Sequence, residues 1–135
     1  VISIHMSIGQ RLPYFVGALG RCFAAFSGMS KQQLKSAYSR IRIENPAPFD
    51  EWYESLDEVR KSKCAVDEGN FSRGFTTISS PVFGADGMPL MTISAVAVSA
   101  QLDPLKRERV INSVIKAAAT VTAAIQGTRA DGTAA

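Results

Sequence analysis

A strict alternation of apolar and polar residues opens the chain and predicts a β-strand over Val1 to Ile8. A period of two places every second side chain on one face of a strand, and here that face is apolar. From Phe15 to Ser27 the apolar residues return at helical spacing, with Gly17 and Gly20 near the start. We therefore expect a helix whose first turn closely approaches another backbone or a ligand.

Two further helices are expected before the middle of the chain. Ser30 and Gln33 have the spacing of a capping box, which predicts a helix whose apolar stripe extends to Ile41. Asp50 is expected to cap a third helix, and the apolar stripe of that helix consists of Trp52, Tyr53, Leu56 and Val59. Acidic residues near the start of this helix and basic residues near its end suit the helix dipole, so we interpret them as helix electrostatics.

The second half of the chain has the composition of β-strands. Cys64 to Val66 is predicted to be a short strand, Asp67 to Arg73 a polar loop, and Phe75 to Phe83 a strand rich in Thr, Ile and Val. The pair Asp86-Gly87 is typical of a tight turn, and Leu90 to Ser99 is the expected return strand. These two longer strands are therefore expected to form an antiparallel hairpin.

A long helix is predicted after the hairpin, from a cap at Asp103 through Pro104 to Gly127, which is expected to end it. Residues 128–135 are expected to be a disordered tail. The order of one strand, three helices, one strand, a hairpin and a long helix favours an α+β fold, in which helices pack on an antiparallel sheet. The chain lacks a glycine-rich phosphate loop after a strand, which argues against a nucleotide-binding doubly wound sheet.

The register of the hairpin predicts what one of its faces carries. A two-residue loop at Asp86-Gly87 places Thr77 opposite Val96 and Ser79 opposite Ser94, while the other face is more apolar and is the expected core. Short side chains leave a hollow, and hydroxyls in a hollow suit a ligand with an anionic or carbonyl oxygen. The alternative is that Thr and Ser simply favour a half-exposed strand, and the pattern alone leaves both open.

Two features could close this hollow. The start of the first helix, Val16-Gly17-Ala18, presents backbone N–H groups without partners inside the helix, which is the composition of an anion site. Asp67 follows a predicted strand and could accept a hydrogen bond from a ligand hydroxyl. The alternative for Asp67 is a cap of its own loop.

Composition narrows the classes of function. The 135 residues are 46% apolar and carry 15 Lys and Arg against 12 Asp and Glu, which is the composition of one soluble domain. The net charge of +3 is too small and too scattered for binding DNA phosphates. Uninterrupted apolar runs are too short to span a bilayer and the start of the chain lacks a signal-peptide pattern, so we expect a cytoplasmic protein without membrane association.

Catalytic chemistry has little support in the sequence. The single histidine is His5, and no group of His, Cys and acidic residues has the spacing of a metal site, so neither a metal nor a cofactor is expected. Ser79-Ser80 lacks the glycine frame of a hydrolase nucleophile. Cys22 and Cys64 have no partner pattern and are interpreted as buried structural residues.

Three blocks of sequence occur in an order that points to a known family. They are Gly9 to Pro13 with Ala18 to Arg21 and Ala25-Phe26, then Asp67 to Gly74 with Ile78 to Phe83, then Ile93-Ser94 in the strand after Gly87. In order and spacing these blocks resemble the C-terminal effector-binding domain of the IclR family of bacterial transcription regulators. Each block is weak alone, and their succession carries the resemblance.

The resemblance implies a GAF-like domain over residues 1–127, a curved antiparallel sheet flanked by helices that binds a small organic acid. It implies a site lined from the start of the first helix, the acidic loop and two strands, and no catalytic residue. We add Phe15 to these residues, and Ser79 because of the hairpin register. The expected ligand-binding residues are then Phe15, Val16, Gly17, Ala18, Asp67, Thr77, Ser79, Ser94 and Val96.

Departures from the family pattern shape the expected function. Phe15 stands where members often have His, and Thr77 where some have Cys, so a more apolar wall favours an aromatic acid. The winged helix-turn-helix and the opening strands of the effector domain are absent, so DNA contact is implied only through that missing N-terminal part, and assembly as a homodimer or homotetramer is also implied. The expected function is sensing of a carboxylate effector that alters operator binding; the alternatives are a small metabolite-converting enzyme with the same pocket and a structural interaction domain without a ligand.

Overall fold

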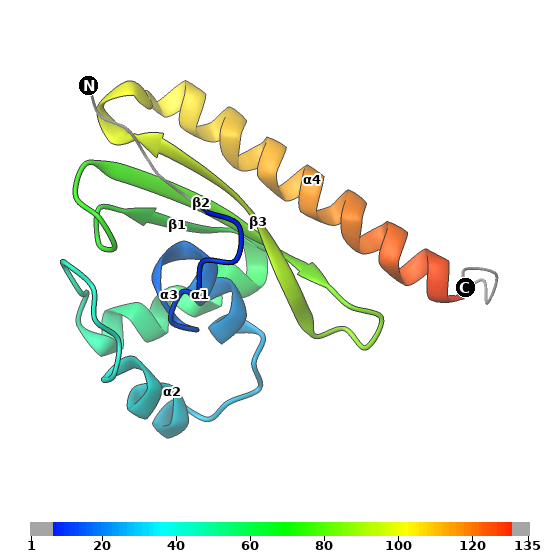
Figure 1. Ribbon diagram of the computed structural model, residues 1–135, viewed down its shortest axis with the longest axis horizontal. Helices are drawn as coiled ribbons and strands as arrows, with labels where there is room; N and C mark the ends of the chain where they lie inside the picture. The colour runs from blue at the N-terminus through cyan, green and yellow to red at the C-terminus, as the bar shows by residue number, and fades with distance from the viewer. Residues whose placement is uncertain (1–6, 131–135) are drawn as a thin grey trace.

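The computed structural model describes the backbone of residues 7–130 and the side chains of residues 7–127. Three antiparallel strands form a sheet, with one long helix on one face and three shorter helices on the other (Figure 1). This arrangement confirms the predicted α+β fold. The strand predicted over Val1 to Ile8 lies largely outside the described residues, as does His5, and Ile8 itself belongs to a turn.

The three shorter helices are α1 (Gly17–Ala25), α2 (Lys31–Tyr38) and α3 (Phe49–Ser62). The predicted capping box of α2 is confirmed, because the Ser30 hydroxyl accepts from the Gln33 N–H at 3.2 Å and the Gln33 side chain accepts from the Ser30 N–H at 2.9 Å. The prediction of a cap at Asp50 is wrong. Pro48 is the N-cap of α3, and Asp50 lies in the first turn, where its charge faces the positive end of the helix dipole.

The sheet contains β1 (Ala65–Glu68), β2 (Phe75–Phe83) and β3 (Pro89–Val98) in the order β1-β2-β3. The predicted register of the hairpin is confirmed, because Thr77 pairs with Val96 and Ser79 with Ser94. The predicted two-residue loop is wrong. The backbone N–H of Gly84 donates to the Met88 carbonyl at 2.8 Å, which closes a longer loop, and an irregularity between Val82 and Phe83 restores the register.

A short 3₁₀ turn, η1 (Ser99–Gln101), leads into the long helix α4 (Pro104–Ala130). The predicted cap is confirmed, since the Asp103 carboxylate accepts from the Lys106 N–H at 2.9 Å. The prediction that Gly127 ends this helix is wrong, because Gly127 keeps a helical backbone and α4 continues to Ala130. The expected tail over residues 128–135 is thus helical in its first residues, and residues 131–135 lie outside the described part.

Length and hydropathy also give α4 the properties of a membrane-spanning segment, because an 18-residue window within Pro104–Gly127 has a mean hydropathy of 1.2. A mostly buried core helix of a water-soluble protein meets the same criteria, but only 11% of this window is buried here. Val114 and Ala118 of α4 are buried, and Val114 packs with Ile78 of the sheet. We therefore interpret α4 as the helix that covers this face of the sheet, and the expected absence of membrane association remains a prediction.

Two hydrophobic cores lie on opposite faces of β2. The larger joins α1, α2, α3 and β1, and its fully buried members include Leu34 and Leu56. The smaller lies under α4 around Ile78 and Val114. Burial of each such aliphatic side chain contributes about 1.5–3 kcal/mol, so both layers hold the sheet in place.

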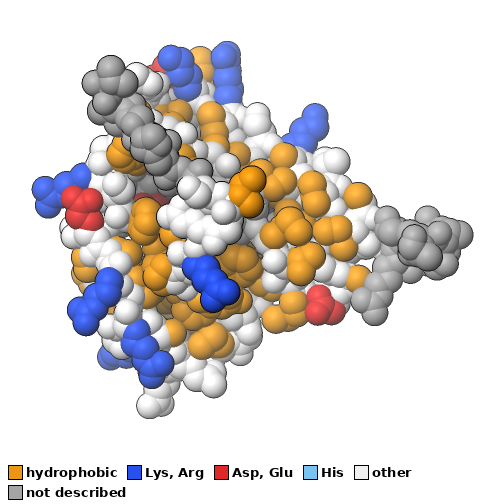
Figure 2. All heavy atoms as spheres, viewed as in Figure 1, with side chains coloured by type: hydrophobic (Ala, Val, Ile, Leu, Met, Phe, Trp, Pro, Cys, Tyr) orange, Lys and Arg blue, Asp and Glu red, His pale blue; other side chains and the backbone are white. Residues whose placement is uncertain are grey.

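The hairpin leaves part of its apolar surface in contact with solvent. Leu90, Met91 and Val96 of β3 are exposed, and β3 is an edge of the described sheet. Figure 2 shows hydrophobic side chains gathered on the face that β3 occupies in Figure 1. Val96 also lines the first of the two cavities described below.

Candidate functional site

A cavity of about 230 Å³ lies between the start of α1 and the sheet. We call it the sheet cavity. Its walls come from the segment before α1, from α1 itself, from β1 and the loop after it, and from β2 and β3. The lining residues are Gln10, Leu12, Val16, Gly17, Ala18, Leu19, Asp67, Phe71, Ser72, Phe75, Thr77, Ser94 and Val96. Apolar side chains form most of this wall, with a few polar groups among them, as is usual for a small-molecule site.

Seven of the nine residues predicted from the sequence meet at this cavity. They come from four separate parts of the chain, namely the start of α1, β1, β2 and β3, and are Val16, Gly17, Ala18, Asp67, Thr77, Ser94 and Val96. The pairing of Thr77 with Val96 and of Ser79 with Ser94 explains why two hydroxyl-bearing strand positions face the same side. The hollow inferred from the hairpin register is therefore present in the structure.

The start of α1 faces the sheet cavity without a side-chain cap. Val16 is the N-cap and makes no capping hydrogen bond, so the first backbone N–H groups of the helix have no partner inside it. Gly17 adopts a φ of +65°, and an added Cβ would meet the Phe71 side chain at 3.7 Å. A glycine is favoured there because an L-residue would be strained at this φ, although the contact with Phe71 would be an ordinary van der Waals contact.

Asp67 is the buried acidic residue of the cavity, with 5% of its surface exposed. Its Oδ2 accepts a hydrogen bond from the backbone N–H of Phe71 at 3.0 Å. This contact is the loop cap considered as the alternative role of Asp67. It also orders the loop that carries Phe71 over the cavity, and it leaves the rest of the carboxylate along the cavity wall.

Two predicted site residues lie elsewhere. Ser79 is fully buried beneath α1, and its hydroxyl contacts the Ser94 hydroxyl at 2.7 Å, so it holds Ser94 in place instead of lining the cavity. The Cys22 thiol approaches the Ser79 carbonyl at 3.4 Å from above, which shows how closely α1 covers this position. Phe15 turns toward α3 and packs near Trp52, with ring centroids 6.3 Å apart.

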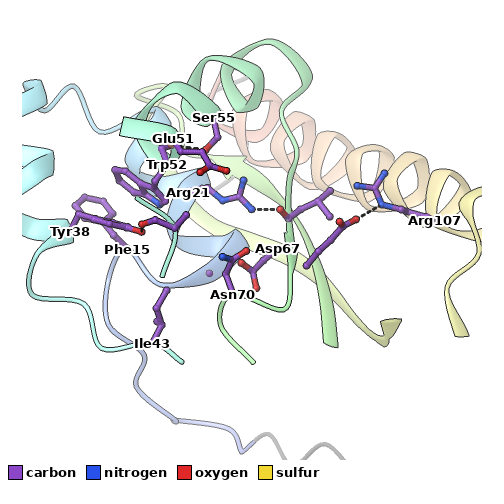
Figure 3. Close-up of a pocket in the computed structure, with 14 residues that line it drawn as sticks. Phe15, Arg21, Tyr38, Ile43, Glu51, Trp52, Ser55, Asp67, Asn70 and Arg107 are labelled. Atoms are coloured by element: carbon purple, nitrogen blue, oxygen red, sulfur yellow. Dashed lines mark hydrogen bonds and ion pairs between the residues drawn. The ribbon is translucent and has the colours of Figure 1, made fainter. Parts of the chain in front are cut away.

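Phe15 instead lines a second cavity of about 240 Å³, which the sequence did not predict. We call it the α3 cavity. Gly17 and Asp67 belong to the walls of both cavities. The remaining walls are Phe15, Arg21, Tyr38, Ile43, Ala47, Glu51, Trp52, Ser55, Val66, Glu68, Asn70 and Arg107 (Figure 3).

Arg21 is the central charged group of the α3 cavity. Its guanidinium donates a hydrogen bond to the Val66 carbonyl, and Figure 3 shows it between Glu51 on one side and Asp67 with Asn70 on the other. Burial lowers the pKa of this guanidinium, while the nearby Asp67 carboxylate opposes that shift. Arginine remains protonated at neutral pH in any such site, so the cavity contains a positive charge.

The two cysteines are buried and free, as predicted. Burial raises the pKa of the Cys22 thiol to about 12 and also raises the pKa of the Cys64 thiol. Neither therefore has the character of an activated nucleophile. Among the residues that the structure describes, no group of His, Cys, Asp and Glu is arranged to hold a metal ion.

One local signal could have indicated the α3 cavity. Arg21 interrupts the small and apolar side chains of α1, where Ala18, Cys22 and Ala25 are buried. A charged residue beside such a stripe needs a polar partner or a cavity. The other walls come from five separate segments, so nothing in the sequence brings them together before folding.

Comparison with known proteins relates this arrangement to a family. The family model described as "Bacterial transcriptional regulator IclR C-terminal" matches residues 1–123. Among curated proteins, none matches the chain significantly.

Solved structures show the same fold. An IclR transcriptional regulator from Alicyclobacillus acidocaldarius is 24% identical, with a TM-score of 0.77 over 91% of this chain and 50% of the other. The repressor BlcR from Agobacterium tumefaciens is 17% identical, with a TM-score of 0.76 over 90% of this chain and 51% of the other. The inducer-binding domain of the PobR transcription factor from Acinetobacter, a double mutant in complex with 3-hydroxybenzoic acid, is 18% identical, with a TM-score of 0.70 over 90% and 72%. The chain thus spans about half the length of the first two of these proteins.

Proposed function

This chain belongs to the IclR family of bacterial transcriptional regulators, as its C-terminal effector-binding domain, and from that premise we propose that its sheet cavity binds a small aromatic carboxylate. The observation that carries the proposal is the meeting of an uncapped helix start with two strand hydroxyls in one apolar cavity. Backbone N–H groups and hydroxyls donate hydrogen bonds to a carboxylate, and the helix dipole favours a negative charge at this end.

The chemistry of the walls supports an aromatic body for the ligand. Phe71, Phe75, Leu12 and Leu19 provide flat or branched apolar contacts around the polar groups. The apolar wall expected from Phe15 is therefore supplied by other residues, since Phe15 lies in the α3 cavity. A volume of about 230 Å³ lies below the range of about 300–1,000 Å³ typical of drug-sized ligands, which favours a compound with one ring.

Asp67 adds a second requirement. A carboxylate at the wall repels an anionic group but accepts a hydrogen bond from a hydroxyl, so a ligand whose ring carries a hydroxyl as well as its own carboxylate suits the cavity. The 3-hydroxybenzoic acid bound by the PobR domain has this chemistry. That similarity of fold supports the class of ligand proposed here.

We further propose that the ligand acts by changing the arrangement of subunits in a longer regulator. The structure of the Alicyclobacillus regulator is about twice as long as the part that this chain matches. DNA contact belongs to a segment outside this chain, and the chain itself assembles as a homodimer or homotetramer. An allosteric coupling of this kind is typically worth about 1–3 kcal/mol.

Thermal unfolding in the presence of 3-hydroxybenzoate tests the ligand proposal. At about 100 times Kd the ligand stabilises the folded state by about 2.7 kcal/mol, and the expected rise in Tm is about 8 °C. Thr77→Val removes one hydroxyl without changing the size of the side chain, and it is expected to weaken binding about tenfold. Thr120→Val on the exposed side of α4 is the matched control and leaves Kd unchanged.

Two outcomes would contradict the proposal. One is the absence of a Tm shift with 3-hydroxybenzoate, benzoate and acetate alike. The other is an equal shift in the wild type and in Thr77→Val, which would place the ligand outside the sheet cavity. Turnover of the bound compound would favour the enzyme considered above over a sensor.

A further inference from the structure

The α3 cavity has a composition unlike that of the sheet cavity and lies on the other side of Gly17 and Asp67. It is enclosed by α1, the end of α2, the segment before α3, α3, and β1 with the loop after it, and Arg107 of α4 lies at its edge. Its volume of about 240 Å³ is sufficient for a small metabolite. The proposed effector function makes no use of it.

One end of the α3 cavity is an aromatic wall. Phe15 and Trp52 are buried, and the Tyr38 ring packs against Trp52 with centroids 4.7 Å apart. The Tyr38 hydroxyl donates to the Ala47 carbonyl, so the ring is fixed in place and its face remains along the cavity. Such a wall binds an apolar body by burial and by contact with the ring faces.

Arg21 supplies a positive group beside this wall. The guanidinium has five N–H donors, and the Val66 carbonyl takes one of them. Within residues 7–127, no carboxylate oxygen lies within 4.0 Å of its nitrogens. A partly buried guanidinium with donors to spare is suited to a ligand carboxylate, which it binds through paired hydrogen bonds.

Two carboxylates, those of Glu51 and Asp67, supply the opposite charge. Glu68 forms an ion pair with Arg107 at 2.9 Å, so these two residues together add no net charge to the cavity. Glu51, in the first turn of α3, forms no ion pair within the described part of the chain, and Asp67 lies across the cavity from it (Figure 3). Apart from that ion pair, the lining therefore has one positive group, Arg21, with a carboxylate on either side of it, next to an apolar wall.

We propose that the α3 cavity is a second ligand site, which binds an α-amino acid with an apolar side chain in its zwitterionic form. The ligand carboxylate pairs with Arg21, its ammonium group faces Glu51, and its side chain packs on Phe15, Tyr38 and Trp52. A compound with only one of the two charges leaves the opposite protein charge without a partner, which costs binding energy in a partly buried site.

Isothermal titration with L-phenylalanine and L-leucine tests this proposal. We expect at least one of them to bind, and binding of the matched compounds 3-phenylpropionate and phenethylamine to be at least about tenfold weaker, because each lacks one charged group. Glu51→Gln is expected to weaken amino-acid binding about two- to fivefold, because Glu51 is exposed and its ion pair is screened by solvent. Glu54→Gln, an exposed acid one turn along the same helix and outside the lining, is expected to have no effect.

The same titrations separate this site from the effector site. Thr77→Val, in the sheet cavity, is expected to leave amino-acid binding unchanged and to weaken binding of 3-hydroxybenzoate only. Failure of both amino acids to bind would overturn the second site, as would equal binding of 3-phenylpropionate or of phenethylamine. The second site would also be overturned if Glu51→Gln left the Kd for the amino acid unchanged, or if Thr77→Val abolished amino-acid binding. Either result would count whatever the outcome with 3-hydroxybenzoate.

Discussion

Gly20 is the residue at which α1 comes closest to the turn that precedes it. A Cβ built on Gly20 would lie 2.1 Å from the backbone carbonyl carbon of Phe15, a distance that no rotation of a side chain can relieve. The small size of this one residue therefore positions Phe15 in the α3 cavity and Val16 in the sheet cavity. The geometry of both cavities depends on it.

Gly20→Ala is expected to lower the free energy of unfolding by about 3 kcal/mol or more, because the backbone must move to accept the methyl group. Urea unfolding followed by circular dichroism measures this loss. Gly127→Ala is the matched control, since Gly127 is helical and an added Cβ there meets nothing within 4 Å. It is expected to stabilise the protein by up to about 1 kcal/mol, and a loss below 1 kcal/mol in Gly20→Ala would contradict the close approach.

The buried thiols give a prediction that depends on pH. Burial raises the pKa of Cys22 to about 12, so its thiol is expected to stay protonated in the folded protein up to pH 10. An unfolded thiol has a pKa of about 8.5 and is mostly thiolate at that pH. The ultraviolet absorbance of the thiolate, compared between wild type and Cys22→Ser in a Cys64→Ser background, measures the difference, and a native thiolate signal with a midpoint near pH 8.5 would contradict the burial of Cys22.

At the scale of elements, Asp103 shows how a single cap defines the start of the longest helix. Its carboxylate accepts from the Lys106 N–H, and this hydrogen bond, together with the Lys106 side chain 3.6 Å away, lowers the pKa of Asp103. A lowered pKa in the folded state means that ionised Asp103 stabilises the fold above the unfolded pKa of about 3.9, and that this stabilisation is lost as pH falls through the folded value.

Asp103→Asn keeps a capping oxygen but removes the charge. The variant is expected to be less stable than the wild type at pH 7, and the difference is expected to shrink as the pH falls below about 4, because the wild-type carboxylate then becomes neutral. Thermal unfolding of both proteins across this range measures the difference. A gap that stays constant down to pH 2 would show that the charge of Asp103 contributes nothing.

Local signals predicted most of the elements. The capping box at Ser30, the cap at Asp103 and the strand over Phe75 to Phe83 depend on neighbours a few residues apart, and all three are confirmed. The hairpin register was also predicted correctly, although the loop is longer than expected, because an irregularity after Val82 compensates for the difference. Gly127 misled the prediction because a glycine ends a helix only where the backbone turns left-handed.

How deeply a residue is buried was harder to predict from the sequence than which face of a strand it occupies. Alternation along a strand indicates that Ser79 and Ser94 share a side, but only the docking of α1 decides that Ser79 is fully buried while Ser94 lines the cavity. Phe15 depends in the same way on the turn before α1. The α3 cavity was missed because its walls come from segments far apart in sequence.

At the scale of the whole molecule, β2 is a central strand covered on both faces. α4 and the smaller core lie on one side, and α1 with the larger core lies on the other (Figure 1). Both cavities lie on the α1 side and share Gly17 and Asp67. A ligand in the sheet cavity therefore contacts α1 and the sheet together.

A crystal structure of the chain soaked with 3-hydroxybenzoate tests the central claim most directly. The account predicts electron density for the ring beside Ser94 and Val96, with the carboxylate within hydrogen-bonding distance of the Thr77 or Ser94 hydroxyl or of the first backbone N–H groups of α1. A saturated crystal whose sheet cavity holds only water, or a ring bound anywhere else on the molecule, would contradict it.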